Sequence, residues 1–230
     1  MGQGRVGVGE PGPSDVGLKV ARRAVAWAGA SLDGEQEAKL AIYAQWLADE
    51  AIPAGGLGPR EAPRLWRRHI ADSLTFAVGW HHQVPVELVD VGAGVGLPGI
   101  PLAILWPDCR ITLLDRAGRR IRLLRRIVRI LALDGVTVVL GDAFSLADEW
   151  EGIVFRGSVT AGEAVRLSAT MLAEGGTAVL ALSRRRSLSE ESRSLVGMAV
   201  VHGLEAELQE IPHAILDGPA WLLIMRRNVV

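Results

Sequence analysis

Cysteine is almost absent from this 230-residue sequence, which contains Cys109 alone. One cysteine excludes an intrachain disulfide, a cysteine-based zinc site and any mechanism that pairs two thiols, and it fits a reducing compartment. We therefore expect no metal site. Lysine is also scarce, because Lys19 and Lys39 are the only lysines among 25 basic residues. Local positive charge therefore depends on clusters of arginine.

Long uninterrupted hydrophobic runs are missing as well. The longest apolar window, residues 86–106, contains Asp90, Pro98 and Pro101 and is rich in glycine, which argues against a membrane span. Residues 1–14 are rich in Gly and Pro and lack the basic segment and apolar core of a signal peptide. We therefore expect a cytoplasmic protein without membrane contact, and a disordered segment over residues 1–14.

Apolar residues are plentiful, at 49% of the total, which is enough for the core of one α/β domain with an extension. Residues 15–30 and 32–52 carry apolar residues at helical spacing, and residues 61–78 resume this pattern after a break rich in Gly and Pro. These patterns predict a helical cap over residues 15–80 and a main domain over residues 81–230.

Short β-branched runs alternate with helical patterns in the main domain. The expected strands cover residues 88–91, 110–114, 136–140, 153–155, 177–182, 200–207 and 221–225, and the expected helices cover residues 100–106, 119–133, 143–150 and 161–172. Such alternation predicts a mostly parallel sheet with helices on both faces. The last two strands lack a strong helix pattern between them, which predicts an antiparallel edge pair. Seven strands so arranged are typical of class I methyltransferases, a Rossmann-like α/β fold.

A glycine-rich segment follows the first expected strand and precedes a helix pattern. Glycine tolerates positive φ and lets the backbone approach a ligand, and a helix start attracts negative charge. Residues 94–99 match G-x-G-x-x-G, and Asp115 follows about 20 residues on, as in NAD(P)-binding oxidoreductases. From Asp90, the same segment also matches D-x-G-x-G-x-G, the pattern of S-adenosylmethionine sites. Two cofactors are therefore compatible with this segment.

Several details favour S-adenosylmethionine. In a dinucleotide-binding site, the first strand is apolar up to the first glycine of the motif, whereas here Asp90 and Gly92 precede that glycine. Pro98 also occupies the start of the helix. Gly141-Asp142-Ala143 ends the third strand, where methyltransferases commonly hold the adenine. Asp115 would bind ribose hydroxyls with either cofactor. We therefore predict a methyltransferase and keep an NAD(P)-binding oxidoreductase as the alternative.

The expected substrate side lacks two common catalytic motifs. Neither an Asn/Asp-Pro-Pro-aromatic sequence nor a cysteine nucleophile follows the fourth strand at residues 153–155. An acceptor atom that already carries a free lone pair needs neither motif, and N7 of guanine is such an atom, which requires only positioning. Arg156 directly follows this strand, where it would hold an anionic group or a base edge, or else form a structural ion pair.

Arginines cluster in two helix patterns. They are Arg64, Arg67 and Arg68 in the first, and Arg119, Arg120, Arg122, Arg125, Arg126 and Arg129 in the second. Together they would supply a phosphate-binding surface for a nucleic acid. The alternative is that they solvate the outer faces of amphipathic helices.

The glycine-rich segment also carries a resemblance to a known family. The string from Asp90 to Ile104, with Leu113-Leu114-Asp115 and Arg119-Arg120-x-x-Leu123-Leu124, closely resembles the ribosomal RNA small subunit methyltransferase G family, also called glucose-inhibited division protein B. Gly58-Pro59-Arg60-Glu61, Arg64-Leu65-Trp66 and Arg68-His69 resemble its actinobacterial branch. The resemblance implies S-adenosylmethionine-dependent methylation of a guanine N7 in 16S ribosomal RNA, with the small ribosomal subunit as partner. We expect a monomer.

The resemblance also implies roles for individual residues. The cofactor site would comprise Asp90, Gly92, Gly94, Gly96, Leu97, Asp115, Asp142, Ala143, Phe144 and Arg156. Asp115 would bind the ribose, and Ala143 and Phe144 would flank the adenine. Arg156 would also be catalytic, together with Arg68 and His69 at the entrance for RNA.

The sequence departs from the family pattern on the substrate side. Phe155-Arg156-Gly157 replaces Ser-Arg-Ala, Phe144 replaces an acidic residue, and Ser183-Arg184 replaces Lys-Gly after the fifth strand. Either Arg184 to Arg186 take over the role of the lysine, or the protein is a divergent member with a different or weakened substrate. A silent relative that binds RNA or the ribosome is therefore a second alternative.

Overall fold

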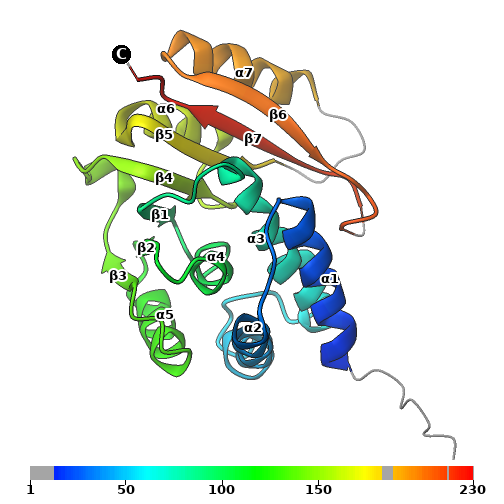
Figure 1. The fold of residues 1–230 in the computed structure, drawn as a ribbon. Coiled ribbons are helices and arrows are strands. Elements are labelled where there is room, and N and C mark those ends of the chain that lie inside the picture. Colours follow the sequence, from blue (N-terminus) through cyan, green and yellow to red (C-terminus); the bar gives the residue numbers. More distant parts are fainter. Residues whose placement is uncertain (1–12, 183–188, 217, 230) are drawn as a thin grey trace, which may run out of the picture.

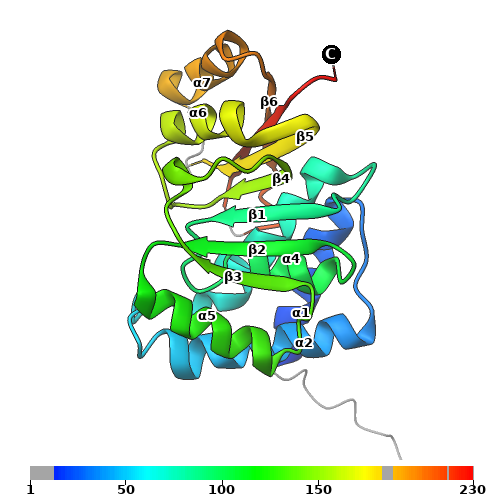
Figure 2. The same ribbon diagram turned by 90° about the vertical axis from the view of Figure 1, so that its left-hand side faces the viewer.

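The computed structural model describes residues 13–182, 189–216 and 218–229. Its centre is a seven-stranded sheet with helices on both faces (Figures 1 and 2). The strands are β1 (Glu87–Val91), β2 (Arg110–Asp115), β3 (Val136–Leu140), β4 (Trp150–Phe155), β5 (Leu172–Ala181), β6 (Glu205–Ile211) and β7 (Ala220–Arg226). They lie in the order β3-β2-β1-β4-β5-β7-β6.

The sheet is parallel from β3 to β5, and β7 runs antiparallel to both β5 and β6. This confirms the predicted mostly parallel sheet with an antiparallel edge pair. Val91 at the end of β1 is in register with Leu114 of β2 and Phe155 of β4. The loops that follow these strands therefore emerge at one edge of the sheet, which is where open α/β sheets bind ligands.

Alternate strand residues bury into opposite layers, because successive side chains of a strand point to opposite faces. Leu88 and Leu113 pack against α4 (Gly99–Leu105), α5 (Gly118–Ile130) and the N-terminal helices. Val89 and Leu114 pack against α6 (Ala161–Met171) and α7 (Glu190–Val201). Figure 1 shows α6 and α7 above the sheet and the other helices below it. Burial on both faces explains the nearly continuous apolar runs of these strands.

The N-terminal helices are α1 (Pro13–Trp27) and α2 (Gly34–Trp46), and α2 continues into the π-helical η1 (Leu47–Ala51). Asp33 starts α2 with a capping box, because its carboxylate accepts from Gln36 N at 2.8 Å and the Gln36 side chain accepts from Asp33 N at 2.9 Å. The segment predicted as one helix over residues 61–78 is instead a run of four short helices. They are η2 (Ala62–Arg64), η3 (Leu65–Ile70), α3 (Ala71–Leu74) and η4 (Thr75–Trp80), of 3-10, π, α and 3-10 type.

The N-terminal helices share a core with the sheet. Tyr43 and Phe76 are fully buried in the same hydrophobic cluster as Leu88 and Ile100. The predicted division of the chain at residue 80 stays a prediction. Pro13 already begins α1, and residues 1–12 lie outside the described part of the chain. Across the described ranges, we find no helix that is both long and apolar enough to cross a membrane.

Two predicted elements of the main domain are wrong. The helix expected over residues 143–150 is a single 3-10 turn, η5 (Ala143–Ser145), because Leu146 takes an extended backbone and β4 starts at Trp150. The strand expected over residues 200–207 begins only at Glu205. Residues up to Val201 belong to α7, which Ser189 caps by accepting from Ser192 N, and the β-branched Val201 is an exposed helix end.

Candidate active site

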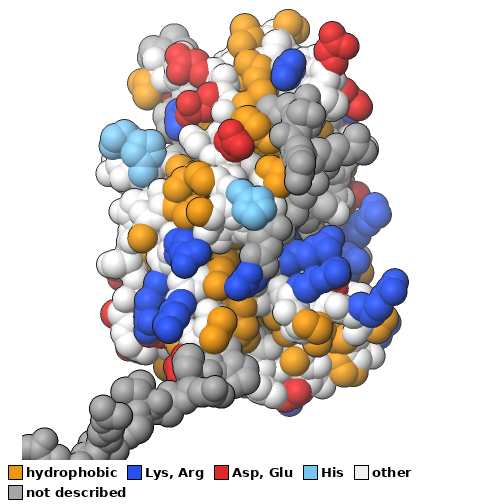
Figure 3. Space-filling view, turned by 90° about the vertical axis from the view of Figure 1, so that its right-hand side faces the viewer, with side chains coloured by type: hydrophobic (Ala, Val, Ile, Leu, Met, Phe, Trp, Pro, Cys, Tyr) orange, Lys and Arg blue, Asp and Glu red, His pale blue; other side chains and the backbone are white. Residues whose placement is uncertain are grey.

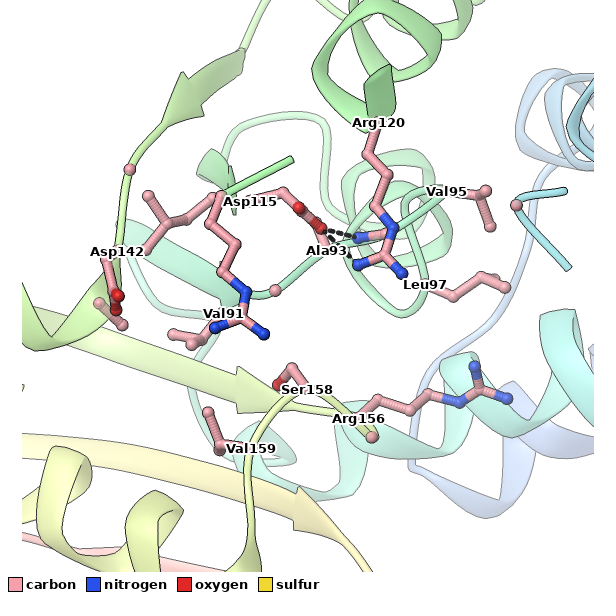
Figure 4. A pocket seen from close by; sticks show the side chains of 18 of the residues that line it. Val91, Ala93, Val95, Leu97, Asp115, Arg120, Asp142, Arg156, Ser158 and Val159 are labelled. Carbon is pink, nitrogen blue, oxygen red and sulfur yellow. Dashed lines mark hydrogen bonds and ion pairs between the residues drawn. The ribbon is translucent and has the colours of Figure 1, made fainter. Parts of the chain in front are cut away.

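A cavity of about 370 Å³ opens at the carboxyl ends of β1, β2 and β4 (Figure 4). It is lined by residues 91–95, 114–116, 141–144 and 156–159, together with Gly56, Leu57, Leu97 and Arg120. Its volume lies within the range of about 300–1,000 Å³ that is typical of small-molecule sites. The topology thus places the predicted glycine segment in the wall of a ligand-sized cavity.

The glycines after β1 turn the chain sharply around this cavity. Gly92, Gly94 and Gly96 have φ values of +72°, +63° and +98°, which side chains rarely tolerate. A Cβ on Gly92 would also lie 2.3 Å from Ser158 Cβ, whereas one on Gly94 would have no neighbour closer than 3.9 Å. Gly92 is therefore required for packing as well as for the turn, while Gly94 faces open space.

Asp90 lies behind the glycine turn and does not line the cavity. Its side chain is buried, and Oδ2 accepts from Gly99 N at 2.8 Å, at the start of α4. Oδ1 is buried without a hydrogen-bond partner among the described residues. Burial raises the pKa of Asp90 to about 7, although the Gly99 amide and Arg156 oppose this shift. The hydrogen bond of Asp90 is therefore with the start of α4.

Asp115 at the end of β2 does line the cavity. Oδ2 accepts from Gly94 N at 2.9 Å, and Oδ1 accepts from Ala117 N at 2.8 Å. Arg120 lies 3.4 Å from Oδ2 and forms an ion pair with it. The carboxylate is thus held in one orientation by two amides and an arginine. Each oxygen retains lone-pair capacity for a ligand hydroxyl.

The wall after β3 combines a capped turn with an exposed ring. Asp142 accepts from Phe144 N at 3.1 Å and starts η5. Ala143 is buried, whereas Phe144 is 57% exposed beside the cavity. On another wall, the Ser158 hydroxyl is buried with no protein partner in the described part of the chain. The wall therefore offers an apolar ring, and Ser158 offers an unused hydroxyl.

The Gly- and Pro-rich break after η1 also belongs to the site, which the sequence did not predict. Gly56 and Leu57 line the cavity. Tyr43 of α2 is fully buried and donates to Val95 O at 3.0 Å, so the cap supports the glycine turn directly. Arg119 of α5 donates to Ala54 O. The only signal in the sequence was the Gly-rich composition of this break, which is as typical of a linker as of the wall of a ligand site.

Arg156 leads from the cavity to a second cluster. Its Nε donates to Asp72 Oδ2 at 3.0 Å, and one terminal nitrogen lies 2.9 Å from Arg68 O and 3.3 Å from His69 Nδ1. Figure 4 shows its side chain extending away from Asp142. Arg156 also lines a neighbouring cavity of about 540 Å³ with Arg68 and Trp221. The residue thus separates two cavities.

The predicted site residues fall into three groups. The larger cofactor group lines the first cavity and comprises Gly92, Gly94, Leu97, Asp115, Asp142, Ala143, Phe144 and Arg156. Asp90 and Gly96 do not line this cavity, and Gly96 packs against Ile100. Arg68 and His69 lie outside this cavity and meet it only through Arg156. Arg184 to Arg186 lie outside the described residues.

The arginines of α5 are partly used within the fold. Arg119 reaches Ala54 O, Arg120 pairs with Asp115, and Arg126 donates to Glu50 Oε1 at 2.9 Å. Arg64, Arg67 and Arg68 of the N-terminal cap are exposed. On the face drawn in Figure 3, Lys and Arg side chains gather in the lower half, and most acidic ones lie above. The predicted phosphate-binding surface therefore stays a prediction.

Comparison with known proteins assigns the family. The profile of rRNA small subunit methyltransferase G matches residues 36–208. The chain belongs to the rRNA small subunit methyltransferase G family. The methyltransferase G of Corynebacterium glutamicum is 32% identical over 87% of this chain and 91% of its own length, and that of Mycolicibacterium smegmatis is 33% identical over 81% and 80%. The Streptomyces coelicolor protein is 45% identical, but the match spans only 48% of this chain and 45% of that one.

Solved structures support the fold of this methyltransferase G family member. A precorrin-6y C5,15-methyltransferase from Geobacter metallireducens has a TM-score of 0.52 at 18% identity, covering 69% of this chain and 87% of that one. Fibrillarin from Aeropyrum pernix has a TM-score of 0.51 at 20% identity, covering 63% and 69%. The fold is thus the class I methyltransferase fold. The antiparallel β7 between β5 and β6 also differs from the parallel 3-2-1-4-5-6 order of dinucleotide-binding sheets, so the oxidoreductase alternative is not favoured.

Proposed function

We propose that this protein transfers the methyl group of S-adenosylmethionine to N7 of a guanine in 16S ribosomal RNA. The observation that carries the proposal is the intact glycine turn in the wall of a ligand-sized cavity, in a member of the methyltransferase G family. The small ribosomal subunit, or its RNA, is the partner that we propose. We also propose that the protein acts in the cytoplasm. We propose that it is a monomer, and light scattering of the purified protein will test this by measuring its molar mass.

The residues around the cavity suit this cofactor. The Asp115 carboxylate stands at the end of β2, where it would accept hydrogen bonds from the ribose hydroxyls. The exposed Phe144 ring beside Ala143 would cover one face of the adenine. The turn at Gly92 and Gly94 would face the amino-acid part. When bound, the cofactor supplies an activated methyl group on a sulfonium.

The protein contributes position and charge to this reaction. Guanine N7 already carries the attacking lone pair, so the acceptor needs no general base, and catalysis depends on proximity and alignment. Arg156 lies between the two cavities and is the residue that we propose to contact the acceptor side. Arginine donates in a fixed planar fork, which suits a purine edge or a phosphate.

The test is methyl transfer to 16S ribosomal RNA and to small subunits from a strain that lacks this modification. We expect incorporation of one radiolabelled methyl group per RNA, at a guanine N7 identified by borohydride and aniline cleavage. Calorimetry of the same preparation measures S-adenosylmethionine binding. Cofactor binding without transfer to either substrate would favour the silent RNA- or ribosome-binding alternative, and the absence of both would overturn the proposal.

A substitution of Arg156 separates the two steps. Arg156→Ala should lower the transfer rate by about 10- to 100-fold, the scale of losing hydrogen bonds from a charged group. Affinity for S-adenosylmethionine should change much less. Arg156→Lys is the matched control, because it keeps the charge and loses the fork. An equal loss of cofactor affinity would make Arg156 a cofactor residue instead.

A further inference from the structure

The guanidinium of Arg156 is held by a segment far away in the sequence. It contacts the Asp72 carboxylate, the Arg68 carbonyl and His69 Nδ1, at 3.0, 2.9 and 3.3 Å. Asp72 and His69 are 8% and 6% exposed, so their contacts with Arg156 are partly buried, whereas the contact with the Arg68 carbonyl is exposed. The ion pair between Arg156 and Asp72 is stronger in this partly buried place than it would be at the surface, because the local dielectric constant is lower.

The partners of His69 determine where its proton lies. Arginine can only donate, so His69 Nδ1 must accept from Arg156 and carry no proton. The other ring nitrogen, Nε2, lies 2.9 Å from Glu61 Oε2 and must then donate to that carboxylate. Glu61 at the N-cap of η2 thus selects one tautomer of a neutral imidazole.

The charges that face His69 are mixed. Glu61 and Asp72 favour a protonated ring, whereas Arg156 disfavours it, and Arg68 lies against the same Glu61 carboxylate at 3.7 Å. Burial dominates this balance and lowers the pKa of His69 below its usual value. The neutral form that the hydrogen bonds require is therefore also the form present at neutral pH.

We propose that Glu61, His69 and Asp72 are positioning residues that fix Arg156 for the methyl acceptor, and that His69 does so only as the neutral Nε2–H tautomer. This inference rests on the proposed function. It gives the 61–72 segment a role in the reaction although neither Glu61 nor His69 lines the cofactor cavity. Arg156 is the residue that would touch the substrate, and the other three act through it.

The proposal predicts the direction of a pH effect. A proton on Nδ1 would remove the acceptor for Arg156 and place two cations 3.3 Å apart. Methyl transfer should therefore fall as the pH falls through the pKa of His69, which lies below its usual value of 6.5. Cofactor affinity should not follow the same curve.

Two substitutions of His69 test this role. His69→Leu removes the acceptor, and we expect kcat to fall about tenfold with little change in the Kd for S-adenosylmethionine. His69→Asn keeps a carbonyl oxygen near the place of Nδ1, so it should recover part of the rate and lose the acid limb of the pH profile. His202→Asn, at the exposed end of α7, is the matched control and should behave as the wild type. Circular dichroism checks that each variant is folded.

A second readout does not depend on activity. The protein contains five histidines, and nitrogen-15 NMR of labelled histidine reports the tautomer and pKa of each, with His69→Asn providing the assignment. We expect His69 to be the Nε2–H tautomer and to have a pKa below the usual histidine value of 6.5. A Glu61→Gln variant keeps an acceptor for Nε2–H and leaves the Arg156 contact with Nδ1 in place, so it should retain that tautomer.

The outcomes separate this inference from the proposed function. If wild-type protein transfers no methyl group but His69 shows the expected tautomer, the proposed function fails and the positioning geometry stands. A protonated Nδ1 in the neutral ring would overturn the inference. So would a folded His69→Leu variant with wild-type kcat, or an acid limb that persists in His69→Asn.

Discussion

Gly92 combines a backbone requirement with a packing requirement. Its φ is +72°, and a Cβ would lie 2.3 Å from Ser158 Cβ. Gly157 has a similar φ of +67°, but a Cβ there would meet nothing within 4 Å. The two glycines therefore form a natural comparison, because only one of them adds a steric clash to the same backbone strain.

We expect Gly157→Ala to lower the free energy of unfolding by about 1–2 kcal/mol, the cost of a left-handed conformation for an L-residue. Gly92→Ala should lower it clearly more, since Ser158 must also move. Urea denaturation of both variants measures the difference. Equal losses would mean that the loop after β4 yields to the added methyl group at no cost.

Asp90 gives the stability of the protein a dependence on pH. Its pKa rises from 3.8 in the unfolded chain to about 7 in the fold, so the folded state binds more protons between these values. Stability from this group is full below pH 4 and is lost as the pH rises through 7. From pH 5 to pH 8 the loss amounts to about 3 kcal/mol at most.

An Asp90→Asn variant should remove this dependence, because the amide oxygen still accepts from Gly99 N and cannot ionise. We expect the variant to gain stability relative to the wild type between pH 5 and pH 8, as measured by urea denaturation at both values. His69 acts in the opposite direction, and it is present in both proteins, so its effect cancels. Parallel pH curves for the two proteins would contradict the assignment.

At the scale of elements, α2 supports the glycine turn after β1 through one hydrogen bond. Tyr43 is fully buried and donates to Val95 O, and its ring also stacks on Trp46 at 6.1 Å. Burial raises the pKa of Tyr43 well above its usual value, so the hydroxyl stays protonated and remains a donor. The cap thereby influences a turn that is 52 residues away in the sequence.

Tyr43→Phe isolates this bond, since it keeps the ring and leaves the Val95 carbonyl unpaired. We expect a loss of about 1–3 kcal/mol in the free energy of unfolding and weaker binding of S-adenosylmethionine by calorimetry. Trp46→Phe is the control, because it perturbs the same stack without touching the turn. A variant with reduced stability and unchanged cofactor affinity would limit Tyr43 to a structural role.

For the whole molecule, the shared core argues against two independent units. One hydrophobic cluster joins buried residues of α1, α2 and η4 to residues of β1, α4 and α5. We therefore expect the chain to unfold in a single transition. Four of the seven tryptophans, Trp27, Trp46, Trp66 and Trp80, lie in the N-terminal part, so fluorescence is weighted toward it, whereas far-UV circular dichroism reports on the whole fold. Transitions at two different urea concentrations would support a separable cap.

The sequence alone was enough to predict the glycine turn after β1 and most of the sheet. A turn with positive φ needs glycine, which leaves a glycine-rich pattern around Gly92. A strand buried on both faces needs an apolar run, which is visible in β1. The predicted secondary structure of residues 143–150 and 200–207 was wrong, because the composition of each short stretch suits more than one kind of element. Tertiary packing decided the outcome there.

Only the tertiary structure showed which residues surround Arg156. Asp72 meets it across 84 positions of sequence, and Glu61 reaches it through His69. Hydrogen bonds between distant segments leave no periodic signal, because they depend on how helices and strands pack and not on neighbouring residues. The cofactor could therefore be predicted from a local motif, whereas the contacts of Arg156 could not.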